Sequence, residues 1–284
     1  MNYCENIQKS IDYIEKNIKD DVDIYTAIQQ SGYSTTHFYR IFQAFMGETI
    51  KEYIIKRKLS DAAIELMVTK KRLIEIAIDY GFNSQEVFTR AFTKLFNITP
   101  GRYRKSKNSI TLYDRVNTYH RVLANIGDSI EPIIVLEKEF KLIGIKKTVK
   151  PGDALIGSLW NEFNLRKFEI RNIATDDTML GICEYTPNIT DESEFEYFAG
   201  IEVAEFAEFN TIPRGMITKT ISRSKYAVFT HKGNMNELRT TYNNIYGTWL
   251  PLSGNELAEM DTIEIYSVKN NQDCKLDIYI PLKL

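Results

Sequence analysis

Residues 32–42 read GYSTTHFYRIF, and residues 81–92 read GFNSQEVFTRAF. Beyond Asn83 the two stretches match at a constant offset of fifty residues, from Ser34 with Ser84 to Tyr53 with Tyr103. Each begins with a glycine, which tolerates a left-handed turn, and then a serine, which accepts hydrogen bonds from the free amides that open a helix. The repeat predicts two helix-turn-helix units, a pattern typical of proteins that place the second helix in the major groove of DNA.

The segment between the units predicts one long helix. Residues 50–68 place apolar side chains at helical spacing and contain neither Gly nor Pro. Such a helix would hold the two second helices at a fixed separation, roughly one turn of DNA, or about 34 Å. Helical spacing also assigns four aromatic side chains to the cores of the two units: Phe38, Phe42, Phe88 and Phe92.

The order of these motifs, closed by the stretch TPGRYR at residues 99–104, resembles the DNA-binding domain of the AraC/XylS family. The sequence departs from the family pattern at Ile28, where a small residue usually precedes the first turn. The resemblance implies base contacts from both second helices, made by Thr36, Tyr39, Arg40, Gln85, Glu86, Thr89 and Arg90. We expect phosphate contacts from Lys70, Lys71, Arg102, Arg104 and Lys105, for which a solvated surface is an equally simple explanation.

The chemistry of these residue types agrees with base reading. Arg donates two hydrogen bonds to guanine, Gln pairs with adenine, Glu accepts from cytosine and Thr contacts the thymine methyl group. The alternative is that Arg40 and Arg90 are solvated helix charges. Residues 1–107 carry 17 Lys and Arg against 13 Asp and Glu, whereas the rest of the chain carries 19 against 25. This asymmetry suits a first half that binds a polyanion and a second half with a different task.

From residue 133 the pattern changes to short β-branched or alternating runs, which predict strands at residues 142–149, 179–185, 196–203, 216–221, 226–231, 262–268 and 276–281. Two helical stretches interrupt them, at residues 155–168 and 235–250. The order strand, helix, strand, strand therefore occurs twice. We expect a multidomain chain, with an all-α double helix-turn-helix domain over residues 1–107, a connector over 108–130 and a duplicated α+β domain over 131–284.

The second half is rich in aromatic residues that could line a cleft between its two repeats. Those that we expect at the cleft include Trp160, Phe163, Tyr185, Tyr197, Phe198, Tyr242, Tyr246, Trp249, Tyr266 and Tyr279. Two carboxylates, Glu184 and Glu264, take matching places in the repeats on this interpretation. Aromatic faces attract cations, and a buried carboxylate is costly unless a cation neutralises it, so the pattern favours an organic cation, such as a small cationic aromatic effector, or another amphipathic small molecule. Tyr-rich strands and a solvated Glu are the alternative.

This half resembles the GyrI-like effector-binding domain, through Trp160 in the first helix, WLP at residues 249–251, IEIY at 263–266 and LDIYIP at 276–281. The order of the two domains resembles that of Rob-like family members. The resemblance implies a multidrug-type sensor in which a buried carboxylate faces the ligand. That role falls on Glu264, with Glu184 second, among the expected ligand contacts Trp160, Tyr185, Tyr197, Trp249 and Tyr266.

The remaining signals favour a regulator over an enzyme. The chain contains no GxSxG, HExxH, P-loop or dinucleotide fingerprint, and its three cysteines lack any CxxC, so we expect no catalytic residue, metal or cofactor. It shows neither a secretory signal pattern nor a long apolar run, so we expect a cytoplasmic protein that binds promoter DNA, a small effector and RNA polymerase, but no membrane. A protein-interaction role for the second half, through acidic residues 191–196 and 202–208, or a minor hydrolase activity, stays open.

Overall fold

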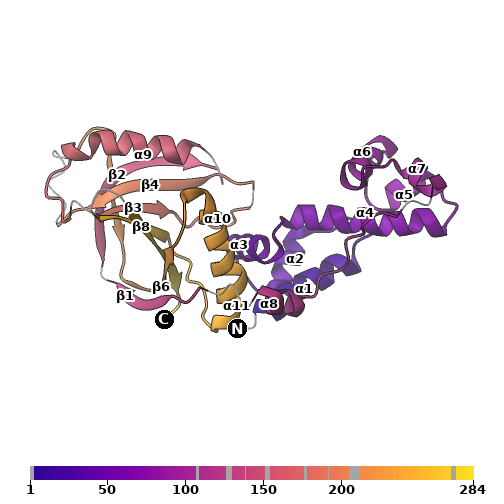
Figure 1. Ribbon diagram of the computed structural model, residues 1–284, viewed down its shortest axis with the longest axis horizontal. Coiled ribbons are helices and arrows are strands. Elements are labelled where there is room, and N and C mark those ends of the chain that lie inside the picture. The colour runs from indigo at the N-terminus through magenta and orange to yellow at the C-terminus, as the bar shows by residue number, and fades with distance from the viewer. Residues whose placement is uncertain are drawn as a thin grey trace.

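A computed structural model describes residues 3–106, 109–125, 130–137, 139–150, 154–175, 178–190, 192–204, 212–269 and 273–284. Helices form one lobe and a mixed sheet-and-helix domain forms the other (Figure 1). The helical lobe contains α1 (Tyr3–Lys16), α2 (Ile24–Ser31), α3 (Thr35–Met46), α4 (Ile50–Val68), α5 (Leu73–Asp79), α6 (Gln85–Phe96), α7 (Pro100–Ser106) and α8 (Thr118–Asn125). The helical N-terminal region followed by an α+β domain confirms the predicted fold class.

The predicted turns and caps are present in both units. Gly32 and Gly81 have φ values of 70° and 74°, the left-handed conformation that favours glycine. Ser34 accepts a hydrogen bond from the third amide of α3, and Ser84 does the same for α6. The long helix α4 has the predicted bounds and opens with a capping box at Thr49. The predicted core positions are also confirmed, since the four phenylalanines of the repeat are at most 1% exposed.

The second lobe is built on one antiparallel sheet of eight strands in the order β1-β6-β8-β7-β3-β4-β2-β5. The strands are β1 (Ile133–Glu137), β2 (Phe140–Val149), β3 (Thr178–Cys183), β4 (Phe195–Glu202), β5 (Ile217–Ile221), β6 (Ser224–His231), β7 (Thr262–Lys269) and β8 (Asp273–Leu282). The strand β1 was not predicted. Because β1 pairs with β6 and β5 pairs with β2, each repeat donates its first strand to the other repeat.

Each repeat also contributes a helical segment between its strands. The first contains α9 (Leu155–Arg166) and the short turn η2 (Lys167–Glu169); the second contains η4 (Met235–Glu237), α10 (Leu238–Asn244), the π-helix η5 (Ile245–Trp249) and α11 (Leu250–Ser253). The helix α9 packs on β2 and β4, whereas η5 packs on α3 of the other lobe. Neighbouring strand residues face opposite sides of the sheet, so Tyr197 lies in the core under α9 and Phe198 lies in the core of the other face.

The first helix-turn-helix unit shares one hydrophobic core with the second half of the sheet-containing lobe, residues 131–284, which we call the effector lobe after the domain that it resembles in sequence. Phe38, Ile41 and Phe45 of α3 belong to the same cluster as Phe229 of β6 and Trp249 of η5. The second helix-turn-helix unit has a separate core around Phe88 and Phe92. Packing therefore joins α1–α3 to the effector lobe and leaves α5–α7 apart from it, as Figure 1 shows. No helix of the described segments is long and apolar enough to cross a membrane.

Candidate DNA-reading helices and effector site

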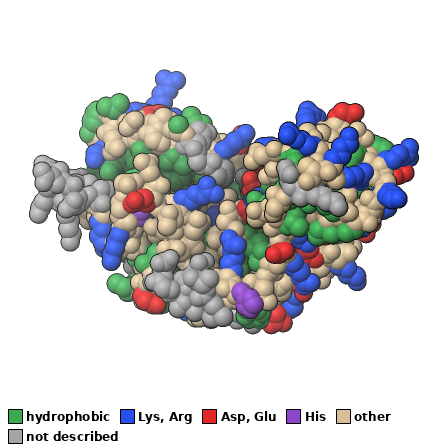
Figure 2. Space-filling view, turned by 45° about the vertical axis from the view of Figure 1, so that its right-hand side comes forward, with side chains coloured by type: hydrophobic (Ala, Val, Ile, Leu, Met, Phe, Trp, Pro, Cys, Tyr) green, Lys and Arg blue, Asp and Glu red, His purple; other side chains and the backbone are tan. Residues whose placement is uncertain are grey.

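The second of the two candidate reading helices, α6, presents its predicted base contacts to solvent. Gln85, Glu86 and Arg90 are exposed and Thr89 is half-buried, while the phenylalanines of the helix point into the core. Figure 2 shows several Lys and Arg side chains, with Asp and Glu among them, on the right-hand lobe, which contains this helix. The surface around α6 therefore suits docking on a phosphate backbone.

The predicted phosphate contacts divide into two groups. Lys70, Arg102 and Lys105 are exposed. Lys71 instead forms ion pairs with Glu65 and Asp79, at 2.7 and 2.6 Å. The guanidinium of Arg104 turns inward and donates to the carbonyl of Leu66, so this side chain braces α7 against α4.

The first reading helix, α3, is covered. Thr36 is fully buried and Tyr39 is 8% exposed. The hydroxyl of Thr36 donates to the carbonyl of Thr186, at 2.6 Å, and accepts from the amide of Ile189, at 3.2 Å. Arg40 donates toward the hydroxyl of Thr262, at 3.5 Å. Thr36 and Arg40 therefore contact effector-lobe residues in this structure, and Tyr39 is buried in the core that the two lobes share, in contrast to the predicted contacts of α6.

A signal for this difference was present in the sequence. At the offset of fifty, Thr36 of α3 corresponds to Glu86 of α6, and Ala44 corresponds to Lys94. The α6 positions carry charges and are exposed, whereas the α3 positions carry small residues that pack against the other lobe. At these two positions the comparison of the repeats indicates a covered surface on α3, although Arg40 and Arg90 match.

The carboxylate of Glu264 is the centre of the candidate effector site. It is 4% exposed and lies on β7 opposite Gly181 of β3. Three phenol groups donate to it: Tyr197 and Tyr266 to Oε2, each at 2.8 Å, and Tyr242 to Oε1, at 2.7 Å. Burial first, and then the charge of Glu264, raises the pKa of all three tyrosines, so they remain protonated donors.

Aromatic rings surround this carboxylate. The indole nitrogen of Trp160 donates to the Tyr197 hydroxyl, at 3.2 Å, and the Trp160 ring meets Tyr266 edge-on at 4.9 Å. Gly181 of β3 allows the Tyr197 side chain to lie close to the backbone of that strand, because a Cβ at residue 181 would lie 2.2 Å from the Tyr197 hydroxyl. The structure thus brings together four of the predicted ligand contacts, namely Glu264, Trp160, Tyr197 and Tyr266. Gly181 was missed, although a glycine inside a strand signals close approach of neighbouring groups.

Three other predicted contacts lie elsewhere. Glu184 does not take the place that matches Glu264: it follows the end of β3 and is ion-paired with Lys219, at 2.8 Å, on the opposite face of the sheet. The side chain of Tyr185 contacts α3, with its hydroxyl 3.4 Å from that of Ser34. The ring of Trp249 packs edge-on against Phe229, in the core that the two lobes share.

The other aromatic residues expected at the cleft also divide. Tyr242 donates to Glu264 and so belongs to this cluster, and the ring of Tyr246 stacks parallel to the ring of Tyr242, with 6.3 Å between centroids. Phe163, on α9, is fully buried in the core between that helix and the sheet. Phe198 and Tyr279 belong to the core on the opposite face of the sheet. Alternation along β4 explains why Phe198 separates from Tyr197, because neighbouring strand residues point to opposite faces.

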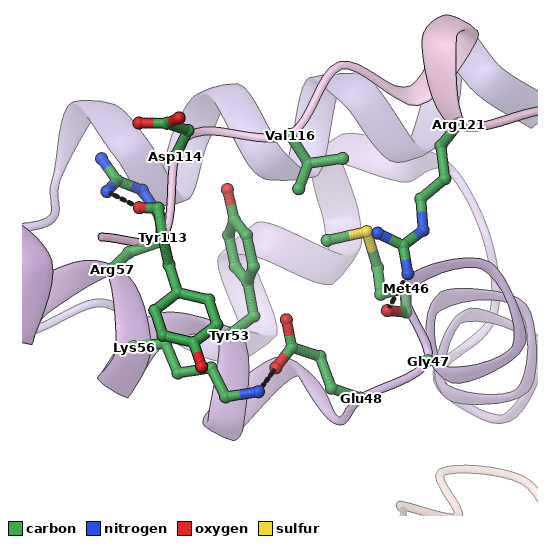
Figure 3. A pocket seen from close by; sticks show the side chains of 10 residues that line it. All are labelled: Met46, Gly47, Glu48, Tyr53, Lys56, Arg57, Tyr113, Asp114, Val116 and Arg121. Atoms are coloured by element: carbon green, nitrogen blue, oxygen red, sulfur yellow. Dashed lines mark hydrogen bonds and ion pairs between the residues drawn. The ribbon is translucent and has the colours of Figure 1, made fainter. Parts of the chain in front are cut away.

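A cavity of about 280 Å³ lies away from this site, between α4 and the connector (Figure 3). Arg57 and Lys56 of α4 are on its wall, and both are paired, Arg57 with Glu15 and Lys56 with Glu48. Arg121 of α8 donates to the carbonyls of Phe45 and Met46, at the C-terminal end of α3. Arg57 also donates to the carbonyl of Tyr113 in the connector, so Arg57 and Arg121 anchor the connector against α4 and α3.

Comparison with known proteins agrees with this architecture. The family described as "GyrI-like small molecule binding domain" matches residues 130–283, and the family described as "Helix-turn-helix domain" matches residues 28–106. The HTH-type transcriptional regulator YbfP of Bacillus subtilis (strain 168), itself uncharacterized, is 40% identical over 104 residues. That match covers 37% of this chain and 35% of YbfP.

Similarity also extends over most of the chain. The right origin-binding protein of Escherichia coli (strain K12) is 26% identical over 260 residues, which is 89% of this chain and 87% of that protein. Among solved structures, SAV2435 bound to tetraphenylphosphonium is 18% identical with a TM-score of 0.44, and covers 54% of this chain and 94% of its own.

Proposed function

We propose a function that starts from the family: the chain belongs to the GyrI-like family of small-molecule binding domains and carries an AraC-type helix-turn-helix domain ahead of it. It is a transcription regulator in which one lobe binds DNA and the other binds a small effector. The similarity to the HTH-type transcriptional regulator YbfP supports a sensor rather than an enzyme. We place it in the cytoplasm, acting on promoter DNA and, through it, on RNA polymerase.

For DNA reading, we propose the residues that the family resemblance implied. The exposure of Gln85, Glu86 and Arg90 on α6 supports this role for the second unit. The helix α4, which separates the units, has 19 residues and is about 28 Å long. This length approaches the pitch of DNA, which allows both units to follow one face of a duplex.

The role of α6 is tested by Arg90→Ala. A lost bidentate contact to guanine should weaken binding to a specific duplex by about 1–3 kcal/mol, and should weaken binding to random DNA much less. The matched control is Lys94→Ala, an exposed cation on the same helix. Equal losses on specific and random DNA would show that Arg90 contacts only phosphate.

For the effector, we propose an aromatic cation held by Glu264. The observation that carries this proposal is a buried carboxylate whose hydrogen-bond donors are three phenols. Within the described residues, no Lys or Arg forms an ion pair with it. Phenol hydroxyls satisfy its lone pairs but leave its charge uncompensated, which is costly in an apolar environment. A cation stacked on the surrounding rings would neutralise that charge.

The test compares tetraphenylphosphonium with neutral triphenylphosphine oxide, by titration calorimetry on the full chain and on Glu264→Gln. At about 4 Å and an effective dielectric constant near 20, the charge pair contributes about 2–4 kcal/mol, so Glu264→Gln should lose roughly 30- to 1,000-fold in affinity for the cation. Binding of the neutral compound should change little. Glu184→Gln, on the opposite face of the sheet, is the matched control and should retain cation binding.

Two results would count against this proposal. If Glu264→Gln weakened the cation and the neutral compound equally, shape and not charge would select the ligand. If Glu184→Gln abolished cation binding while Glu264→Gln did not, the acidic group of the site would be on the other face of the sheet.

A further inference from the structure

The surface of α3 that would face DNA is the surface that packs on the effector lobe. Thr36 is held by the backbone of Thr186 and Ile189, and Lys51 beside the unit pairs with Glu192 at 2.8 Å. His37 meets the ring of Tyr185, at 5.7 Å between centroids. A helix that is covered along this stripe has no free face to insert into a major groove.

Arg40 connects this contact to the effector site. Its guanidinium reaches Thr262, two residues before Glu264 on the same strand, and hydrogen-bonds the side chain of Tyr246. Residues two apart on a strand share one face of the sheet, so Arg40 enters the effector lobe on the face that carries Glu264. The lobe thus receives a cation from the DNA-binding unit itself.

The helical segment that holds Tyr246 also holds Tyr242, which donates to Glu264. These two rings stack parallel at 6.3 Å, one on α10 and the other on η5. The π-helix η5 then presses its Gly247 against α3, where a Cβ would lie 2.6 Å from the carbonyl of Ala44. One continuous segment therefore contacts both the effector carboxylate and the DNA-facing surface of α3.

We infer that DNA and the effector lobe compete for the same surface of α3, and that a cation bound at Glu264 shifts this competition toward DNA. In this structure, which we call the closed state, α3 is covered by the effector lobe and α6 alone is free to read a groove. In the open state α3 is released and becomes the second reading helix. The inference rests on the proposed function, because it takes α3 as a reader and Glu264 as the cation site. Beyond that function, we infer a state of the protein in which α3 cannot contact DNA.

The direction of the shift follows from charge and geometry. A cation at Glu264 adds positive charge on the face of the sheet where the guanidinium of Arg40 is bonded to Thr262 and Tyr246. Repulsion between the two cations weakens the closed contact and disappears once α3 is released. A ligand shifts an equilibrium only through such a difference in affinity for the two states. Apparent DNA affinity then rises with the fraction of open protein.

The first test is Gly247→Leu in the full chain, with Gly157→Leu as the matched control. The added side chain at residue 247 collides with the backbone of α3, whereas a Cβ at Gly157 on α9 has no neighbour within 4 Å. A fluorescein-labelled duplex, selected from a random-sequence pool with the Gly247→Leu chain, is titrated at one fixed salt concentration. We expect Gly247→Leu to bind it about tenfold or more tightly than the unaltered chain, and Gly157→Leu to match the unaltered chain.

Two further arms separate the possible failures. Tyr185→Ala removes the contacts to Ser34 and His37 without adding bulk, and should raise DNA affinity in the same direction by a smaller factor. The aromatic cation of the preceding test should raise the DNA affinity of the unaltered chain and leave that of Gly247→Leu unchanged, because that chain is already open.

The inference is wrong if Gly247→Leu and Tyr185→Ala bind no more tightly than the unaltered chain while Arg40→Ala weakens binding in every background, because α3 is then already free. A different result identifies failure of the proposed function. If Arg40→Ala has no effect even in the Gly247→Leu chain, α3 does not read DNA. If the cation does not bind at all, the Glu264 assignment fails, and the variants still decide the competition.

Discussion

Gly181→Ala tests how tightly the Glu264 site is assembled. Gly181 pairs with Glu264 across β3 and β7, and a Cβ there would lie 2.2 Å from the hydroxyl of Tyr197 and 3.2 Å from Oε2 of Glu264. A methyl group and a hydroxyl cannot occupy that distance. The phenol of Tyr197 must therefore swing away from the carboxylate.

The cost follows from the bonds that this movement breaks. Tyr197 donates to the charged Glu264, at 2.8 Å, and accepts from Trp160, at 3.2 Å. A hydrogen bond to a charged group contributes about 1.5–3 kcal/mol and one between neutral groups about 0.5–1.5 kcal/mol. We expect the free energy of unfolding to fall by about 2–4 kcal/mol, which lowers the midpoint of thermal unfolding of a protein of this size by about 4–16 °C.

Differential scanning calorimetry of the full chain measures this change, and tryptophan fluorescence follows Trp160 at the same site. Gly157→Ala is the control: it adds the same methyl group at an exposed helix position, where alanine is the better helix former. A Gly181→Ala transition within 1–2 °C of the unaltered chain, at about the precision of the measurement, would refute the close packing inferred around Glu264.

Two predictions concern pH. Burial, and then the charge of Arg40, lowers the pKa of His37 to about 4 in the closed state. An imidazole released from this contact has a pKa near 6.5, so protonation favours the open state. The closed state should therefore weaken as pH falls from about 6.5 toward 4, by about 2 kcal/mol at pH 5. DNA affinity of the unaltered chain should therefore rise relative to that of His37→Gln over this range, and parallel curves would contradict the assignment. Hydrogen bonds from Lys71 and Lys19 lower the pKa of Glu65 to about 2, so this carboxylate stabilises the second unit above pH 4.5 and its contribution is lost as pH falls toward 2. Glu65→Gln should lower the unfolding free energy at pH 7 by about 1–3 kcal/mol and flatten its acid dependence, which urea titrations at several pH values measure.

The sequence predicted the features that depend on neighbouring residues. The repeat, the turn glycines, the serine caps and the bounds of α4 are set by local backbone preferences, and all were recovered. The aromatic residues around Glu264 were also recognised by their type. The pairing of Glu264 with Gly181 could not be recovered, because strand register depends on contacts between distant segments.

The same limit explains the error over Glu184. Spacing within a strand gives the face of a residue relative to its neighbours, but not which residue of another strand lies opposite. A one-residue change of register exchanges the two faces, so a carboxylate close to a predicted strand end can lie on either side. Glu184 lies past Cys183, the last residue of β3, and its ion pair with Lys219 fixes it on the face away from Glu264.

The duplicated reading helices show what a shared surface demands of its side chains. A surface that alternates between a protein core and a phosphate-rich groove must satisfy its polar groups in both places, because a buried unpaired charge is costly. Thr36 meets this demand with one hydroxyl that both donates and accepts, whereas Glu86 at the matching position of α6 would be buried without a cation. A charge without partners on that stripe of α3 would therefore open the closed state, whereas Arg40 is tolerated there because it bonds Thr262 and Tyr246. Glu86 is exposed on the matching stripe of α6, which the described residues leave uncovered.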